Sequence, residues 1–134
     1  MDLSRSRGTV GESLERARAR YGRLSPAQAH SAQQEGAIVI DTRCADALRD
    51  EGSIPGALHI PLSVLPWRCD PSSATRDERV ADPGLRLILV CAHGFSSSLA
   101  VASLLDLGLE HATDVVGGFS AWREDGLPVV PPAD

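Results

Sequence analysis

Two short, almost uninterrupted runs of apolar residues constrain the fold of this chain more than any other feature. They are A-I-V-I at residues 37–40 and L-R-L-I-L-V at residues 85–90. Runs of this length and composition are typical of strands that are buried on both faces. Segments with helical signals lie between them. The sequence therefore predicts βαβ units and an α/β fold, with a mainly parallel sheet flanked by helices on both faces.

Local signals add further elements to this pattern. Ser25, Pro26 and Gln28 predict a helix that starts with a capping box, and Gly36 ends it. Shorter strands are expected at 57–61 and 113–116, and residues 62–83 are expected to be mostly loop with one helical turn at 62–65. The other expected helices cover residues 11–21, 44–52, 99–107 and 119–126.

Length and charge narrow the class of protein. A chain of 134 residues is most simply one domain that needs no covalent staples. Its net charge of −5 and pI near 5.3 argue against nucleic acid or an anionic membrane as the main partner. No apolar run is long enough to cross a bilayer, and the N-terminus lacks the apolar region of a signal peptide.

The chain has three cysteines, Cys44, Cys69 and Cys91. An odd number without a C-x-x-C pair fits neither a disulfide framework nor a zinc site. A cytoplasmic location is expected.

The loop after the 85–90 strand, C-A-H-G-F-S-S at 91–97, is the strongest candidate site. Parallel sheets bind ligands at the carboxyl ends of their strands, where Cys91 and Asp41 both fall. A helix that begins just after the loop would lower the pKa of the thiol and hold an anion with its free N–H groups. Ser96, Ser97 and Ser98 are suitable cap residues. The alternative is that Cys91 is simply a small buried core residue.

The loop residues bear on two other chemistries, general base catalysis and phosphate ester transfer. His93 is a candidate general base, although an exposed loop histidine is the stronger interpretation. A cysteine phosphatase needs an arginine that binds the phosphoryl oxygens through two hydrogen bonds, and residues 91–109 contain no arginine or lysine. The sequence therefore disfavours phosphate ester transfer.

Together these residues resemble the single-domain rhodanese (thiosulfate sulfurtransferase) family. The resemblance covers residues 24–129 and rests on four ordered motifs: V-I-D-T-R at 39–43, G-S-I-P-G-A-L-H-I-P at 52–61, C-A-H-G-F-S-S at 91–97, and V-V-G-G-F-S-A-W-R-E-D-G-L-P-V at 115–129. It implies a central five-stranded parallel sheet. It also implies that Cys91 takes a sulfane sulfur from a small anionic donor such as thiosulfate, becomes a persulfide, and passes the sulfur to cyanide or a thiol, with a protein among the candidate acceptors. No metal or organic cofactor is expected.

The resemblance also implies roles for individual residues. The N–H groups of residues 92–97 would hold the persulfide, which assigns a cradle to Ala92, His93, Gly94, Phe95, Ser96 and Ser97. Many single-domain rhodaneses carry arginine at the position of Ser96 and others carry a small hydroxyl residue, so the nature of the donor depends on this position.

Other residues are expected to support the site. Asp41 and Arg43 are expected to form a hydrogen-bonded pair in the active-site wall, and Arg43 as a substrate contact is the lesser alternative. Arg68 is either a cation that approaches the sulfur or a surface residue. Cys44, at a helix start, and Cys69, in a loop, are bystanders or thiols that attack the persulfide.

Four further residues of the motifs are expected to have structural roles. His59 is expected in the core or the sheet and Trp122 in the core, and Gly117 and Gly118 are expected to form a tight turn. We divide the chain into an N-terminal extension with a short helix (1–23), a rhodanese-like domain (24–130) and a tail (131–134). The alternative functions are a rhodanese-fold binding or regulatory module with little turnover and, less favoured, a cysteine-dependent phosphatase.

Overall fold

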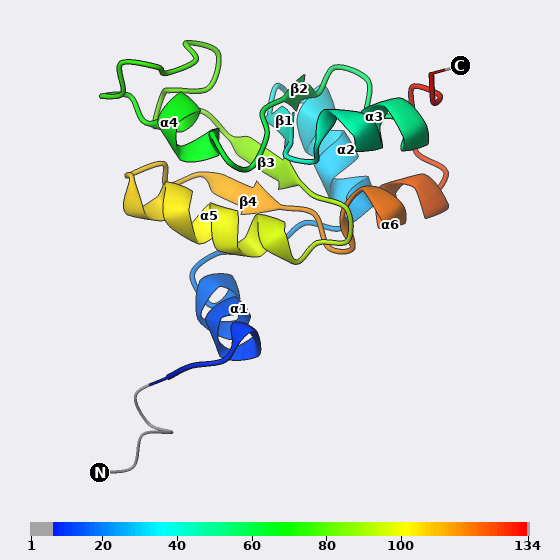
Figure 1. Cartoon of the computed structure of the whole chain (residues 1–134). Helices are drawn as coiled ribbons and strands as arrows, with labels where there is room; N and C mark the ends of the chain where they lie inside the picture. Colours follow the sequence, from blue (N-terminus) through cyan, green and yellow to red (C-terminus); the bar gives the residue numbers. More distant parts are fainter. Residues whose placement is uncertain (1–6, 134) are drawn as a thin grey trace.

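A parallel sheet forms the centre of the computed structural model, which describes residues 7–133 (Figure 1). Its strands are β1 (Ile38–Asp41), β2 (Leu58–His59), β3 (Leu87–Val90) and β4 (Ala112–Asp114). Their order across the sheet is β2-β1-β3-β4, and every neighbouring pair is parallel. The prediction of an α/β fold with a parallel sheet is confirmed.

The expected fifth strand is reduced to one residue, so the prediction of a five-stranded sheet is wrong in number. Leu24 forms an isolated parallel bridge with Val115 at the outer edge of β4. Its N–H donates to the Asp114 carbonyl at 3.0 Å, and its carbonyl accepts from Val116 at 2.9 Å. Ser25 already caps the next helix and Pro26 opens it, so the chain has no room to extend this pairing.

The described residues form six helices: α1 (Val10–Arg18), α2 (Pro26–Gln34), α3 (Ala45–Glu51), α4 (Leu65–Cys69), α5 (Ser96–Asp106) and α6 (Gly118–Glu124). Helix α1 packs against α5. The capping box of α2 is confirmed, because Ser25 Oγ accepts from the Gln28 N–H and Gln28 Oε1 accepts from the Ser25 N–H. Among the described residues 7–133, no helix is long and apolar enough to span a membrane.

Three helices have a boundary that differs from the prediction by three residues or more. Helix α1 ends at Arg18, three residues before the expected end at residue 21. Helix α5 begins three residues earlier than expected, with Phe95 as its N-cap, so the three serines occupy its first turn rather than the cap. The turn at Gly94, with φ of +83°, lets the chain enter the helix immediately. Helix α4 starts where the expected helical turn was to end, and Cys69 is its last residue rather than a loop residue.

The core lies on both faces of the sheet, because successive strand residues point in opposite directions. Ile40, Leu87 and Leu89 pack in one cluster with residues of α4 and α5. Val39, Ile88 and Val90 pack on the other face in a second cluster, which includes the fully buried Phe119 and Trp122. This arrangement confirms helices on both faces and a core position for Trp122.

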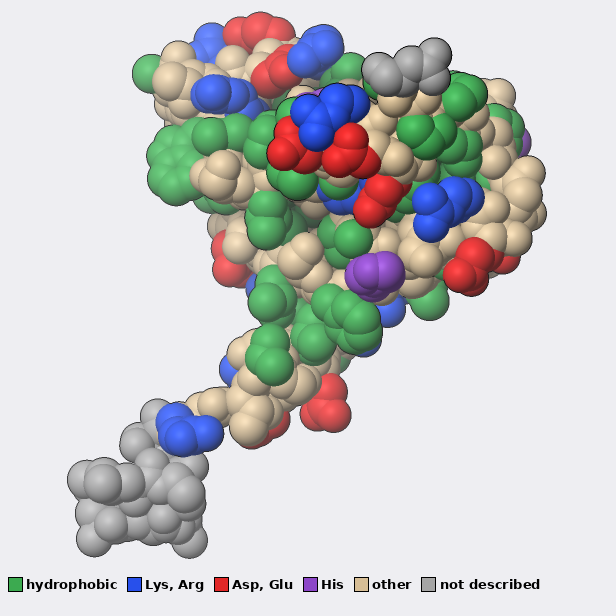
Figure 2. All heavy atoms as spheres, turned by 45° about the vertical axis from the view of Figure 1, so that its right-hand side comes forward, with side chains coloured by type: hydrophobic (Ala, Val, Ile, Leu, Met, Phe, Trp, Pro, Cys, Tyr) green, Lys and Arg blue, Asp and Glu red, His purple; other side chains and the backbone are tan. Residues whose placement is uncertain are grey.

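The strand ends place the motifs side by side. Asp41 is in register with Val90, and Leu89 with Asp114, so β1, β3 and β4 end at the same edge of the sheet. His59 is a sheet residue as expected, although it is exposed, and its Nε2 lies 2.7 Å from the Arg43 carbonyl oxygen. Figure 2 shows acidic and basic side chains interleaved over one face of the molecule rather than gathered by sign.

Candidate active site

The Cys91 thiol lies at the end of β3, where it accepts two backbone hydrogen bonds. The Gly94 N–H donates to Sγ at 3.1 Å and the Ser97 N–H at 3.4 Å. Only 4% of the residue is exposed. The loop therefore wraps around the sulfur and directs N–H groups at it, as the resemblance implies.

The electrostatic balance at this sulfur favours the thiolate. Burial raises the pKa of the Cys91 thiol, but hydrogen bonds from Ser97, Ser96 and Gly94 stabilise the charged form, and the net pKa lies below the ordinary value. The Ser97 hydroxyl has one proton and lies 2.7 Å from Asp114 Oδ2, so the backbone N–H is the main donor that Ser97 offers the sulfur. A thiol with a lowered pKa is a better nucleophile at neutral pH.

The six residues assigned to the cradle divide into two groups. Gly94 and Ser97 are buried and supply the two N–H groups that reach Sγ. The other four are exposed and form the rim of the loop: Ala92, His93, Phe95 and Ser96. The rim residues are the ones that an incoming donor or acceptor would meet first.

The turn at the start of α6 binds the Cys91 loop through backbone hydrogen bonds. The Phe119 N–H donates to the Cys91 carbonyl at 2.8 Å, and the Ser120 N–H donates to the Ala92 carbonyl at 3.1 Å. Gly118 has φ of +60°, and a Cβ there would lie 2.4 Å from the Cys91 carbonyl oxygen. The tight glycine turn expected from the sequence is confirmed, and it lets the two backbones touch.

Asp41 and Arg43 form the buried ion pair that the sequence predicts. Arg43 Nη2 lies 2.8 Å from Asp41 Oδ2 and donates to the Gly52 carbonyl at 2.9 Å, and the guanidinium stacks 3.8 Å from the centre of the Phe119 ring. The Arg43 side chain is 3% exposed. Since its polar atoms are already bonded, a direct substrate contact by Arg43 is not favoured, and its place in the active-site wall stays a prediction.

The remaining candidates, Arg68, Cys44 and Cys69, make no hydrogen bond to Cys91 among the described residues. Arg68 donates to the Thr75 carbonyl at 2.9 Å, and no polar contact joins it to the Cys91 loop within residues 7–133. Cys44 is exposed at the start of α3, as expected. Cys69 is fully buried, and burial together with the nearby Asp77 charge raises the pKa of its thiol to about 12.

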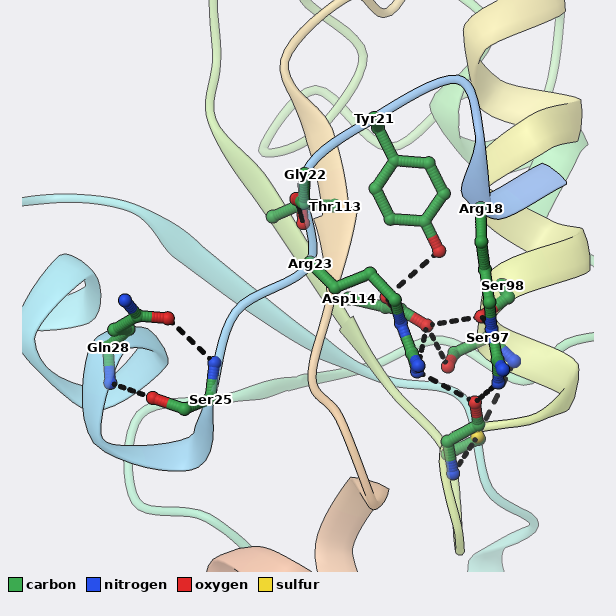
Figure 3. A network of polar contacts seen from close by, with 12 residues as sticks. Arg18, Tyr21, Gly22, Arg23, Ser25, Gln28, Ser97, Ser98, Thr113 and Asp114 are labelled. Carbon is green, nitrogen blue, oxygen red and sulfur yellow. Dashed lines mark hydrogen bonds and ion pairs between the residues drawn. The ribbon is translucent and has the colours of Figure 1, made fainter. Parts of the chain in front are cut away.

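The prediction missed a polar network behind the loop (Figure 3). Asp114, at the end of β4, is fully buried and accepts hydrogen bonds from four side chains: Tyr21, Arg23, Ser97 and Ser98. A charged residue inside the T-D-V-V strand was the available signal, because buried charges require partners. The sequence does not say which arginines supply them.

Comparison with known proteins identifies the family of this chain. The sequence model of the rhodanese-like domain matches residues 25–125. The chain belongs to the rhodanese-like domain family. The resemblance drawn from the four motifs is thereby confirmed.

Rhodanese relatives cover most of this chain. The thiosulfate sulfurtransferase GlpE of Pseudomonas syringae is 35% identical over 103 residues, which span 77% of this chain and 88% of the relative. A rhodanese-related protein of Thermoplasma volcanium superposes with a TM-score of 0.66 at 31% identity, over 82% of this chain and 98% of that one.

One structural neighbour carries a different description. A Rhodopseudomonas palustris protein of unknown function, described as a possible tyrosine phosphatase, has a TM-score of 0.84 and 28% identity. It covers 92% of this rhodanese-like chain, and 95% of its own length is matched. Its description concerns that protein alone.

Proposed function

We propose that the chain is a sulfurtransferase that carries a sulfane sulfur on Cys91, with thiosulfate as a donor and cyanide or a thiol as the acceptor. The observation that carries the proposal is the Cys91 sulfur itself, which accepts N–H bonds from Gly94 and Ser97 and has a lowered pKa. Named thiosulfate sulfurtransferases among the relatives support it.

The proposed reaction has two displacements at sulfur. The Cys91 thiolate attacks the outer sulfur of thiosulfate, an S–S bond forms, and sulfite leaves with the electron pair of the old S–S bond. The resulting persulfide anion accepts the loop N–H groups. An acceptor thiolate or cyanide then attacks the outer sulfur and releases the Cys91 thiolate, so no external oxidant or reductant is required.

The loop suits a compact anion because it holds charge with backbone donors. The first turn of α5, from Ser96, contributes the positive end of a helix dipole to the same site. The exposed Ser96 leaves the mouth of the loop open without a fixed side-chain charge. We therefore expect the dianion thiosulfate to bind weakly, since backbone N–H groups rather than a side-chain cation hold it.

Intact-mass spectrometry after thiosulfate treatment tests the proposal. We expect the wild type to become heavier by one sulfur atom and to return to its original mass when cyanide is added. Cys91→Ser should remain unchanged, while Cys44→Ser, at an exposed site, should load sulfur like the wild type. A wild type that never gains sulfur from thiosulfate, polysulfide or a persulfide donor would exclude a carrier role.

Phosphatase activity is the alternative that the Rhodopseudomonas neighbour suggests. Residues 91–109 contain no cation, and the two guanidiniums behind the loop, those of Arg18 and Arg23, hydrogen-bond to the Gly94 carbonyl. We therefore expect no hydrolysis of p-nitrophenyl phosphate above the rate of Cys91→Ser. Cys91-dependent hydrolysis would favour the phosphatase instead.

A binding module with little turnover is the remaining alternative, and sulfur transfer to cyanide at the rate of Cys91→Ser would support it. We also propose a reducing compartment, the cytoplasm, since Cys44, Cys69 and Cys91 are all free thiols.

We further propose that a protein thiol can serve as the sulfur acceptor, because the rim of the loop is exposed.

A further inference from the structure

Two arginines from the segment that precedes the family match bind one carbonyl of the sulfur loop. Arg18 Nη2 donates to the Gly94 carbonyl at 2.8 Å, and Arg23 Nη2 donates to the same oxygen at 2.9 Å. Both residues lie before residue 25, where the match to the rhodanese-like domain begins. The N-terminal segment therefore contacts the residue whose N–H points at the Cys91 sulfur.

The Gly94 position needs such an external hold. Glycine has no side chain to restrict its backbone, and Gly94 has φ of +83°. Its N–H donates to Sγ, and its carbonyl accepts from the two guanidiniums. The backbone of this one residue therefore connects the sulfur to both arginines. If the carbonyl were free, rotation about Gly94 could turn the loop donors away from the sulfur.

Each arginine is held in place by a second contact. Arg18 Nε donates to Ser98 Oγ at 3.0 Å, in the first turn of α5. Arg23 binds Asp114 through Nε at 2.9 Å and through Nη2 at 3.2 Å. Burial lowers the pKa of the Arg23 guanidinium, but its hydrogen bond with Asp114 and the charge of that carboxylate raise it, with a net upward shift. Arg23 therefore remains charged against the loop.

Charge at this place also favours an anionic sulfur. The two guanidiniums and the single Asp114 carboxylate leave one net positive charge behind the loop. This positive charge comes from Arg18 and Arg23 of the N-terminal segment.

We propose that Arg18 and Arg23 are positioning residues of the sulfur loop, which fix the Gly94 carbonyl away from the sulfur and so keep the Gly94 and Ser97 N–H groups directed at it. The inference rests on the proposed function of Cys91. The N-terminal segment thereby becomes part of the active site rather than an appendage.

Arg18→Gln tests the proposal, with Arg20→Gln as its matched control. Arg20 lies two residues away and also contacts α5, through Asp106 at 2.7 Å and the Ala102 carbonyl at 3.4 Å, but it does not contact the loop. The measurement is the rate of Cys91 alkylation by iodoacetamide as a function of pH, in a Cys44→Ser background, with thermal unfolding in parallel.

We expect Arg18→Gln to shift the alkylation profile to higher pH and to slow alkylation at pH 7 by ~3-fold or more, because a less stabilised thiolate is less populated. Arg20→Gln should keep the wild-type profile, and both variants should unfold at similar temperatures. Arg18→Lys keeps the charge but only one donor group, so its profile should lie between those of Arg18→Gln and the wild type.

An Arg18→Gln profile identical to those of the wild type and Arg20→Gln would overturn the proposal. Arg23→Lys gives the second measurement, and it should shift the profile in the same direction while retaining a cation for Asp114. Alkylation requires no sulfur donor, so these results are separate from sulfur loading. A shifted profile in a protein that never loads sulfur would reject the proposed function and leave the positioning role standing.

Discussion

Cys91, Cys69 and Cys44 are chemically identical side chains in three different environments. Hydrogen bonds from Ser97, Ser96 and Gly94 stabilise the thiolate of Cys91 and lower its pKa, despite its burial. Cys69 is buried without such donors and beside the Asp77 charge, which raises the pKa of its thiol to about 12. Cys44 is exposed at the start of α3. Reactivity at neutral pH therefore follows hydrogen bonding and charge at the sulfur rather than burial alone.

Peptide mapping after iodoacetamide treatment at pH 7.5 checks this order. Cys91 and Cys44 should be modified in the folded protein, and Cys69 should remain free until the protein is unfolded, because its thiol is both protonated and inaccessible. Prior loading with thiosulfate should alter the modification at Cys91 alone. Alkylation of Cys69 at the rate of Cys44 in the folded state would contradict the assignment.

At the scale of elements, the site depends on the contact between two turns, one after β3 and one after β4. The Phe119 and Ser120 N–H groups at the start of α6 bind the Cys91 and Ala92 carbonyls. This contact requires backbone atoms to approach without intervening side chains. A Cβ on Gly118 would lie 2.4 Å from the Cys91 carbonyl oxygen and 2.8 Å from the Gly94 nitrogen.

Gly118→Ala should therefore disturb the loop as well as destabilise the protein. Its matched control is Gly108→Ala, where φ is +86° but no atom lies within 4 Å of the added Cβ. Both variants bear the strain of a positive φ, about 1 kcal/mol. Gly118→Ala should lower the free energy of unfolding by ~2 kcal/mol more and reduce sulfur loading, because the clash falls on backbone atoms.

Urea unfolding and intact-mass analysis measure the two effects. Gly108→Ala should load sulfur like the wild type. Equal destabilisation and equal loading in the two variants would show that the turn tolerates a side chain, and that the contact between the turns is not tight in solution.

The elements themselves were largely predictable because their signals are local. The capping residues of α2 lie within four residues of each other, and the apolar runs of β1 and β3 need no partner to be recognised. The start of α5 was misplaced because serine is compatible with both the cap and the first turn. The number of strands was overestimated because the resemblance implied five, whereas the residues themselves indicated four; the extra pairing at the edge of β4 is the single bridge of Leu24, just before the cap of α2.

The sequence is least informative about contacts between segments that lie far apart along the chain. Cys91 and its loop could be placed from a continuous motif. The contacts of Arg18 and Arg23 with Gly94 join residues that are 76 and 71 positions apart in the sequence. Several other arginines lie in the N-terminal segment, and local sequence does not distinguish them from these two. Only the packing of α1 and the Gly22 turn against α5 and β4 selects among them.

Stability should fall at alkaline pH because two groups with raised pKa values, the buried Cys69 and the partly buried Tyr21, stay protonated in the folded protein. Burial raises the pKa of Tyr21 to about 12, and burial with the Asp77 charge raises that of Cys69 to about 12, from ordinary values of 10.0 and 9.0. Above these ordinary values the unfolded chain loses protons that the folded chain retains. The free energy of unfolding should thus decrease as pH rises from about 9 towards 12, by at most about 1.4 kcal/mol per pH unit for each group.

Urea unfolding at a series of pH values measures this slope. Cys69→Ala should flatten it between pH 9 and 10, where Tyr21 contributes least, whereas Cys44→Ala should leave it unchanged. The Cys91 thiol has a lowered pKa, so its contribution has the opposite sign: up to about pH 10 the unfolded chain still binds part of the proton that the folded protein has released. Cys69→Ala leaves this contribution unchanged. A slope that is unaffected by Cys69→Ala would show that this thiol does not stay protonated in the folded state.

The single-residue bridge of Leu24 has a further consequence for how this protein can be trimmed or fused. A strand at the border of a sheet offers unpaired backbone groups to other chains, and proteins commonly cover or shorten such borders. Here β2 closes one border with only two residues, and Leu24, together with the Gly22 carbonyl bound to Thr113 Oγ1, covers the other. Removal of the residues up to Leu24 would uncover β4 and invite self-association, so point substitutions are the cleaner way to separate the chemistry of this segment from its protective role.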